Sequence, residues 1–204
     1  MRIVWERPWL SSFTTGYMAV FGVSAVLQSN REFVFYAACM ILVIALVLYA
    51  HRMCRFSGLA LWMLSLWGLV HMIGGLVPAP GADASVMYNL WLVDGMLRFD
   101  HVVHAYGFAA ATLVCWEALQ PRLSRTPPTT LLLPVSAALM GLGLGAVNEL
   151  VEFAATRLLP ETNVGGYENT GWDLVSNAFG CVAAATTLAL VGYGDARTRE
   201  HQAS

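Results

Sequence analysis

The sequence predicts an all-α membrane protein, a polytopic bundle of about six transmembrane helices. Of the 204 residues, 57% are hydrophobic and only 12% are charged, whereas soluble domains carry about 45–50% apolar and about 25% charged residues. The mean hydropathy is +0.60. Six stretches are apolar enough to cross a bilayer core of about 30 Å, which takes roughly 20 helical residues. The alternating pattern that a membrane β-barrel requires is absent.

The six spans follow one another without a linker long enough to separate domains, so we expect a single domain over residues 1–204. The first two spans are short, and flanking residues must complete their crossings. The fifth carries Gly141 and Gly145 in a GxxxG spacing, which lets a neighbouring helix approach closely. In chain order, the expected spans are Ser12–Leu27, Phe33–Ala50, Leu59–Val77, His101–Leu119, Thr130–Phe153 and Leu174–Val191.

Arginine placement predicts the orientation. The chain contains no lysine, so arginine alone sets the positive-inside bias. With a cytoplasmic N-terminus, every inner segment holds two arginines and the outer segments hold fewer. We therefore expect both termini in the cytoplasm. The inner arginines are Arg2, Arg7, Arg52, Arg55, Arg122, Arg125, Arg197 and Arg199, and the outer ones are Arg31, Arg98 and Arg157.

Several function classes are excluded by composition and motif. The net charge of −2 argues against a nucleic-acid partner. The four cysteines are scattered without CxxC spacing, and we interpret them as packing residues. The sequence contains no HExxH motif, no serine elbow and no arrangement typical of a cysteine nucleophile.

The ionisable residues within or beside the spans gather at one depth. Because successive helices alternate in direction, the outer ends of the third to sixth spans meet in the same layer of the membrane. Each of these four ends carries polar residues. They are His71 in the third, Asp94, Arg98, Asp100, His101 and His104 leading into the fourth, Asn148, Glu149 and Glu152 in the fifth, and Asp173 and Asn177 in the sixth.

Helical spacing predicts that these side chains share faces. Glu149 and Glu152 are three residues apart, and Asp100 and His104 are four apart. Clustered carboxylates repel, so a cation must offset them, and bundle cores build carboxylate–histidine metal sites from such pairs. We predict a mono- or dinuclear site for zinc, manganese or iron. Its candidate ligands are His71, Asp100, His104, Glu149, Glu152 and Asp173, supported by Arg98, Asn148 and Asn177.

Structural roles remain open for the same residues. His71 alone is typical of a packed, hydrogen-bonded histidine. Asp100 and Asp173 are also typical helix N-caps. Glu149 and Glu152 could instead form a structural ion network with two arginines, Arg98 and Arg157. Asp94 has the spacing of a local salt bridge with Arg98.

The motifs resemble a known group of proteins. LRFDHVVHAYGF, NELVEF and GWDLVSNAFGCVAAA occur in that order within residues 70–190. They resemble the YjdF-like bacterial inner-membrane proteins, and more widely the VanZ-like group, whose helices start D-[KH]-x-x-H and D-x-x-x-N-x-x-G. VanZ-like proteins more often carry E-x-x-Q where this chain has Glu149 and Glu152, so the YjdF-like branch fits better. The resemblance implies a small polytopic protein of a bacterial inner membrane and supplies no established reaction.

Three functions follow from these features. The first is a membrane metalloenzyme acting on a lipid or lipid-linked substrate, with Glu152 or His101 as proton carrier. The second is a non-catalytic factor in envelope stress or antibiotic tolerance, or an accessory subunit of a membrane complex. An ion transporter ranks last, because Glu117 is the only acid expected in the inner half of the spans. The expected partners are the lipid bilayer and either other subunits or further copies of this chain.

Overall fold

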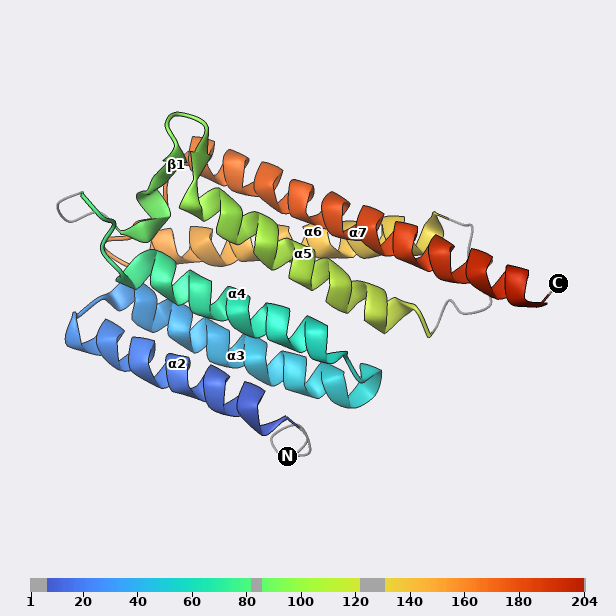
Figure 1. Cartoon of the computed structure of the whole chain (residues 1–204). Helices are drawn as coiled ribbons and strands as arrows, with labels where there is room; N and C mark the ends of the chain where they lie inside the picture. Colours follow the sequence, from blue (N-terminus) through green and yellow to red (C-terminus); the bar gives the residue numbers. More distant parts are fainter. Residues whose placement is uncertain (1–6, 82–85, 122–130, 204) are drawn as a thin grey trace.

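Within the described residues, six long helices run lengthwise beside one another (Figure 1). The computed structural model describes residues 7–81, 86–121 and 131–203. A short 3₁₀ helix and an antiparallel hairpin lie between the third and fourth long helices. In chain order the elements are α2 (Pro8–Leu27), α3 (Arg31–Cys54), α4 (Gly58–Leu76), η1 (Met87–Asn89), β1 (Trp91–Val93), β2 (Leu97–Arg98), α5 (Phe99–Leu119), α6 (Leu132–Leu158) and α7 (Tyr167–Ala203).

Successive helices alternate in direction, so the two termini lie at the same end of the bundle (Figure 1). We call the opposite end the hairpin end. It contains the α2–α3 turn, η1, the β1–β2 hairpin and the α6–α7 loop. Arg31, Arg98 and Arg157 lie at this end, which the arginine pattern predicts to be the outer one.

All six predicted spans are confirmed as helices long and apolar enough to cross a membrane. The first two are longer than expected, with 20 and 24 residues, because they extend into their flanking sequence. The helix α7 begins at Tyr167, seven residues before the expected start at Leu174. Four residues used in predicting the spans and the orientation lie outside the described part of the chain: Arg2, Arg122, Arg125 and Thr130.

The prediction of an all-α fold did not include the β1–β2 hairpin. Its strands have three and two residues, which is too short for a period-two pattern to stand out. Gly95 has a φ of +69°, a conformation that glycine adopts without strain, and it forms the turn. The hairpin leads directly into α5 and so fixes where that helix begins.

Local sequence signals set the starts of the preceding helices. Pro8 occupies the first position of α2, where its missing N–H has no partner to lose. The Asn30 side chain accepts a hydrogen bond from the Phe33 N–H at 3.0 Å and caps α3. Ser57 caps α4 in the same way, through the Ala60 N–H at 3.1 Å.

Glycines bring α5, α6 and α7 into close contact, as the GxxxG spacing on α6 predicts. A Cβ placed on Gly141 would lie 2.2 Å from Oγ1 of Thr112 on α5, and one on Gly145 would lie 3.0 Å from Nδ2 of Asn177 on α7. A Cβ on Gly180 would lie only 2.0 Å from the backbone oxygen of Ala105. The polar ends of these three helices are therefore held close together.

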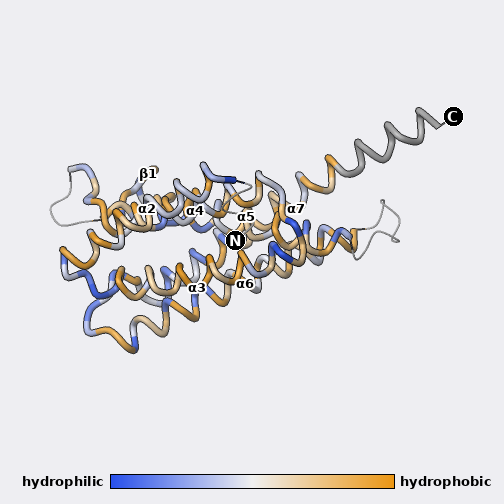
Figure 2. Tube along the Cα trace, turned by 90° about the horizontal axis from the view of Figure 1, so that it is seen from below, coloured by the Kyte–Doolittle hydropathy of each residue, from blue (hydrophilic) through white to orange (hydrophobic). Residues whose placement is uncertain are grey.

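The outward faces of the helices are apolar. Large hydrophobic side chains such as Ile41 on α3, Leu139 on α6 and Val182 on α7 are exposed along the bundle. Figure 2 shows apolar residues along the lengths of the helices. This surface is suited to the acyl chains of a bilayer, and the protein is a multi-pass membrane protein.

Candidate metal centre

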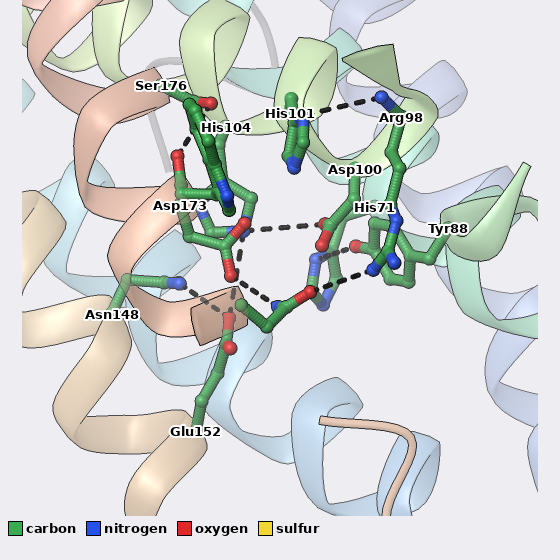
Figure 3. Close-up of polar contacts among 12 residues, drawn as sticks. His71, Tyr88, Arg98, Asp100, His101, His104, Asn148, Glu152, Asp173 and Ser176 are labelled. Atoms are coloured by element: carbon green, nitrogen blue, oxygen red, sulfur yellow. Dashed lines mark hydrogen bonds and ion pairs between the residues drawn. The ribbon is translucent and has the colours of Figure 1, made fainter. Parts of the chain in front are cut away.

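His104 lies at the centre of the polar cluster, on α5 near the hairpin end. Its Nε2 atom is 3.5 Å from Oδ1 of Asp100, one helical turn earlier. The same atom is 3.9 Å from Oε1 of Glu152 on α6 and 3.9 Å from Oδ1 of Asp173 on α7. Three carboxylates from three helices thus surround one imidazole nitrogen, and Figure 3 shows Asp100, Glu152 and Asp173 turned toward it.

The other ring nitrogen of His104 is fixed by Asn177. The Nδ1 atom lies 3.0 Å from the side-chain oxygen of Asn177 on α7. An amide oxygen only accepts hydrogen bonds, so Nδ1 carries the proton and donates it. In the neutral ring, Nε2 then presents its lone pair to the carboxylates, as a metal-binding histidine does.

Glu149 lies on the Nδ1 side of the same ring. Its Oε1 atom is 3.7 Å from Nδ1 and accepts a hydrogen bond from Nδ2 of Asn177 at 3.4 Å. Its Oε2 atom is buried and makes no hydrogen bond to the described residues. One more carboxylate oxygen therefore lies in the interior without a donor.

Amide side chains orient the two flanking acids. The Nδ2 group of Asn148 donates to Oε1 of Glu152 at 2.8 Å, one turn away on α6. On α7, Nδ2 of Asn169 donates to Oδ2 of Asp173 at 2.6 Å. Oδ1 of Asp173 is buried, with no hydrogen-bond partner among the described residues. A buried carboxylate oxygen without a donor costs free energy unless a cation compensates it.

Two groups of three side chains meet the geometric requirement for holding a metal ion. Their ligand atoms lie within 4.8 Å of one another, and His104 belongs to both groups. This confirms that a His/Asp/Glu cluster exists where the sequence predicts one. The groups are Asp100, His104 and Asp173, and His104, Glu149 and Glu152.

Two predicted histidines lie outside these groups. Nδ1 of His71 is hydrogen-bonded to the hydroxyl of Tyr88 at 2.5 Å, and its ring packs among the rings of Phe33 and Tyr36. His101 turns away, as Figure 3 shows, because its Nδ1 accepts a hydrogen bond from the Arg98 backbone N–H at 3.3 Å. These contacts give both histidines structural partners.

The helix-cap interpretations of the aspartates are wrong. The N-cap of α5 is Arg98, and Asp100 lies inside the first turn. Because α7 begins at Tyr167, Asp173 lies in its second turn, where the N–H groups already have helical partners. Both carboxylates are therefore directed into the cluster by their helices.

The predicted pairing of these acids with arginine is also wrong. Among the described residues, the basic atoms that lie 3.5–3.9 Å from the cluster acids are the ring nitrogens of His104, and none belongs to Arg98 or Arg157. Asp94 lies in the turn of the hairpin, where it makes no ion pair with Arg98 within the described part of the chain. Nη1 of Arg98 instead donates to Oδ1 of Asn169 at 3.2 Å, and its guanidinium lies 4.5 Å from the ring centroid of Trp91.

Tyr88 and Asn169 are site residues that sequence reasoning missed. Asn169 precedes Asp173 by one helical turn, a signal that becomes visible once α7 is extended to Tyr167. Tyr88 lies in η1, a segment of three residues that is too short to show a periodic sequence pattern. Burial, and secondly the charge of Asp100, raise the pKa of the Tyr88 phenol well above its usual value of 10.0. The phenol therefore stays neutral beside His71.

The comparisons identify the family. Residues 10–193 match the family described as predicted membrane protein (DUF2238), so the chain belongs to it. No curated protein and no solved structure matches the chain.

Proposed function

We propose that this DUF2238 protein binds a divalent metal ion at Nε2 of His104 and uses it to hydrolyse a lipid or lipid-linked substrate. The observation that carries the proposal is the arrangement of three carboxylates around that one nitrogen, at 3.5–3.9 Å. Ligand atoms about 2.1 Å from a tetrahedral ion lie roughly 3.4 Å from each other. Small side-chain movements would therefore bring Asp100, Glu152 and Asp173 into coordination.

The donor set favours zinc, manganese or iron, because one imidazole and several carboxylates suit these ions. Of the predicted ligands, His71 is engaged by Tyr88, and Glu149 lies on the Nδ1 side of the ring. We assign Glu149 to charge balance and to holding Asn177. Asn148 and Asn177 orient the ligands, as the partners of metal ligands commonly do.

A bound divalent ion would supply an activated water and polarise the group that is attacked. Oε1 of Glu152 lies near His104 and is held by Asn148, so its second carboxylate oxygen, Oε2, would accept the proton of that water. His101 is the weaker candidate because its Nδ1 is used at the start of α5.

The location of the cluster supports a substrate that reaches the membrane surface. All of its ligands lie at the hairpin end, which the arginine pattern predicts to be the outer end, with both termini in the cytoplasm. The resemblance implies that the membrane is a bacterial inner membrane. We infer a relation to the YjdF-like and VanZ-like proteins from the DHVVH and DLVSNAFG motifs, which contain His104, Asp173 and Asn177.

A transport path is poorly supported. Glu117, near the other end of α5, accepts a hydrogen bond from the Ser57 N–H at 2.7 Å, at the start of α4. It is therefore used in joining two helices. Within the described residues, the remaining acids of the spans lie toward the hairpin end.

Metal analysis of the purified full-length protein tests the proposal. Wild type should copurify with, or after loading retain, an equimolar amount of zinc, manganese or iron, and Asp173→Asn should lose it. Glu168→Gln is the matched control because Glu168 is an exposed carboxylate on the same helix. Equal metal content in wild type and Asp173→Asn would overturn the proposed site. A loaded protein that hydrolyses no lipid would favour the accessory-subunit alternative.

A further inference from the structure

A small cavity lies directly against the cluster. Its volume is about 70 Å³, and Asp100 and Glu152 form part of its wall. The rest of the lining includes Tyr36, Tyr88 and Arg98. A space of this size holds on the order of five waters. It fits one small polar group and is too small for an acyl chain.

Two side chains at this cavity have hydrogen-bond donors that bond to no described residue. The hydroxyl of Tyr36 is buried, with 7% of the residue exposed, and finds no hydrogen-bond partner among the described residues. Arg98 has five N–H donors, of which one bonds to Asn169. It pairs with no carboxylate of the described residues, although Asp100 is only two positions away in sequence.

Packing holds the Arg98 side chain in place. The stacking on Trp91 and the hydrogen bond to Asn169 anchor its guanidinium from two directions. An arginine that is anchored by neutral groups keeps its charge available to a ligand. In Figure 3 the guanidinium reaches toward Tyr88, and both residues line the cavity.

We propose that this cavity binds the phosphoryl group of a phosphate monoester, with Arg98 and Tyr36 as its protein donors. The inference rests on the proposed metal function, since the ion offsets the charge of Asp100 and Glu152 and contacts the same group. A planar guanidinium matches the oxygens of a phosphate, and the hydroxyl supplies a further donor. The phosphoryl group is also small enough for the volume.

A second, larger pocket at the hairpin end shares part of its lining with the cavity. It has a volume of about 570 Å³ and is formed by the α2–α3 turn and the α6–α7 loop. Glu32 and Asn163 line both spaces. The Oε2 atom of Glu32 accepts a hydrogen bond from the Asn163 N–H at 2.8 Å. This bond connects the start of α3 to the α6–α7 loop. The polar remainder of a head group would occupy this outer pocket, with the phosphoryl group beneath it.

Phosphorus relaxation tests the subsite on full-length protein loaded with Mn²⁺ in phosphatidylcholine nanodiscs. Inorganic phosphate is the probe, because a nucleus beside Mn²⁺ relaxes faster. Wild type should accelerate the relaxation, whereas Arg98→Gln and Tyr36→Phe should bind phosphate roughly tenfold to a hundredfold more weakly. Their metal content should equal that of wild type. Arg157→Gln is the control because Arg157 is an exposed arginine at the same end of the bundle.

The two proposals fail in different ways. Unchanged phosphate relaxation in both variants, with the metal bound, overturns the subsite and leaves the metal site standing. Absence of metal from wild type overturns the proposed function. In that case, the subsite is overturned too unless phosphate alone raises the Tm of wild type and not that of Arg98→Gln. Binding of acetate as tight as that of phosphate also overturns the phosphoryl assignment.

Competition identifies the source of the phosphate. Displacement of inorganic phosphate by phosphatidic acid in the nanodiscs would support a lipid head group as ligand. Displacement by glycerol phosphate in solution, without an effect of phosphatidic acid, would support a soluble monoester. Failure of both to displace it contradicts the assignment to a monoester.

Discussion

Asn177 on α7 fixes the ring of His104 on α5, with 3.0 Å between the amide oxygen and Nδ1. Asn177 has no exposed surface and also donates to Glu149. One buried amide therefore joins three helices and sets which nitrogen of His104 faces the carboxylates. The proposed metal site would therefore depend on this residue, although it is not one of the proposed ligands.

Replacing Asn177 should weaken metal binding without removing a ligand. In Asn177→Ala, both tautomers of His104 become available and the ring loses its orientation, so we expect affinity to fall about 10- to 100-fold. Titration with a competing chelator measures the change. Ser176→Ala is the control, since the Ser176 hydroxyl bonds to the backbone oxygen of Trp172 on its own helix. Equal affinities in the three proteins would contradict the role of Asn177.

Removing the metal should destabilise wild type more than Asp173→Asn. Without an ion, the buried carboxylates repel one another and Oδ1 of Asp173 lacks a hydrogen bond. An ion at 100 times its Kd adds about 2.7 kcal/mol to the free energy of unfolding. Thermal unfolding with and without chelator should show a Tm drop in wild type and a much smaller one in Asp173→Asn. A drop of the same size in both would argue against binding at Asp173.

Gly180 should tolerate no side chain. A Cβ there would lie 2.0 Å from the Ala105 oxygen, so α5 and α7 must separate in Gly180→Ala. We expect a loss of about 1–3 kcal/mol in stability, together with weaker metal binding, because Asp173 moves with α7. Gly171→Ala on the same helix is the control, since its Cβ would meet no atom within 4 Å. Equal unfolding temperatures of the two variants would disprove the close contact.

Tyr88 should make stability depend on pH in the alkaline range. Its pKa is raised in the folded protein, so the unfolded phenol ionises first as the pH rises. The stabilisation from the buried neutral phenol is complete below pH 10.0 and is lost as the pH rises toward the folded-state pKa. The difference in unfolding free energy between wild type and Tyr88→Phe should therefore shrink above that pH. The exposed Tyr167 provides the control Tyr167→Phe, which leaves the buried phenol of Tyr88 in place.

Labelling of intact cells tests the predicted orientation. Met96 in the hairpin and Met53 at the opposite end of the bundle are both exposed. In a cysteine-free background, Met96→Cys should react with a membrane-impermeant maleimide, and Met53→Cys should react only after lysis. The reverse pattern would place the hairpin end in the cytoplasm.

The sequence was sufficient to predict the helices and the end of the bundle at which the cluster lies. Charged residues are so scarce in the spans that their positions alone locate the polar layer, and the i, i+4 relation of Asp100 and His104 translates directly into their 3.5 Å contact. The start of α7 was harder, since the segment before Asp173 is polar and contains Gly171. Packing against α5, which periodicity does not report, extends that helix.

The partners of His71 and His101 could not be predicted from spacing. Each lies at the expected depth, but depth does not determine which neighbour a ring meets. Tyr88 reaches His71 only because η1 folds back over α4, and His101 is drawn to the first N–H groups of its own helix. Both outcomes depend on the irregular segment between α4 and α5, where no periodic pattern exists.

Glu117 and the two pockets lie at opposite ends of the bundle. Glu117 accepts a hydrogen bond at the start of α4, whereas both pockets are formed by residues of the hairpin end. If the proposed substrate enters through these pockets and its product leaves the same way, product should compete directly with substrate for that opening.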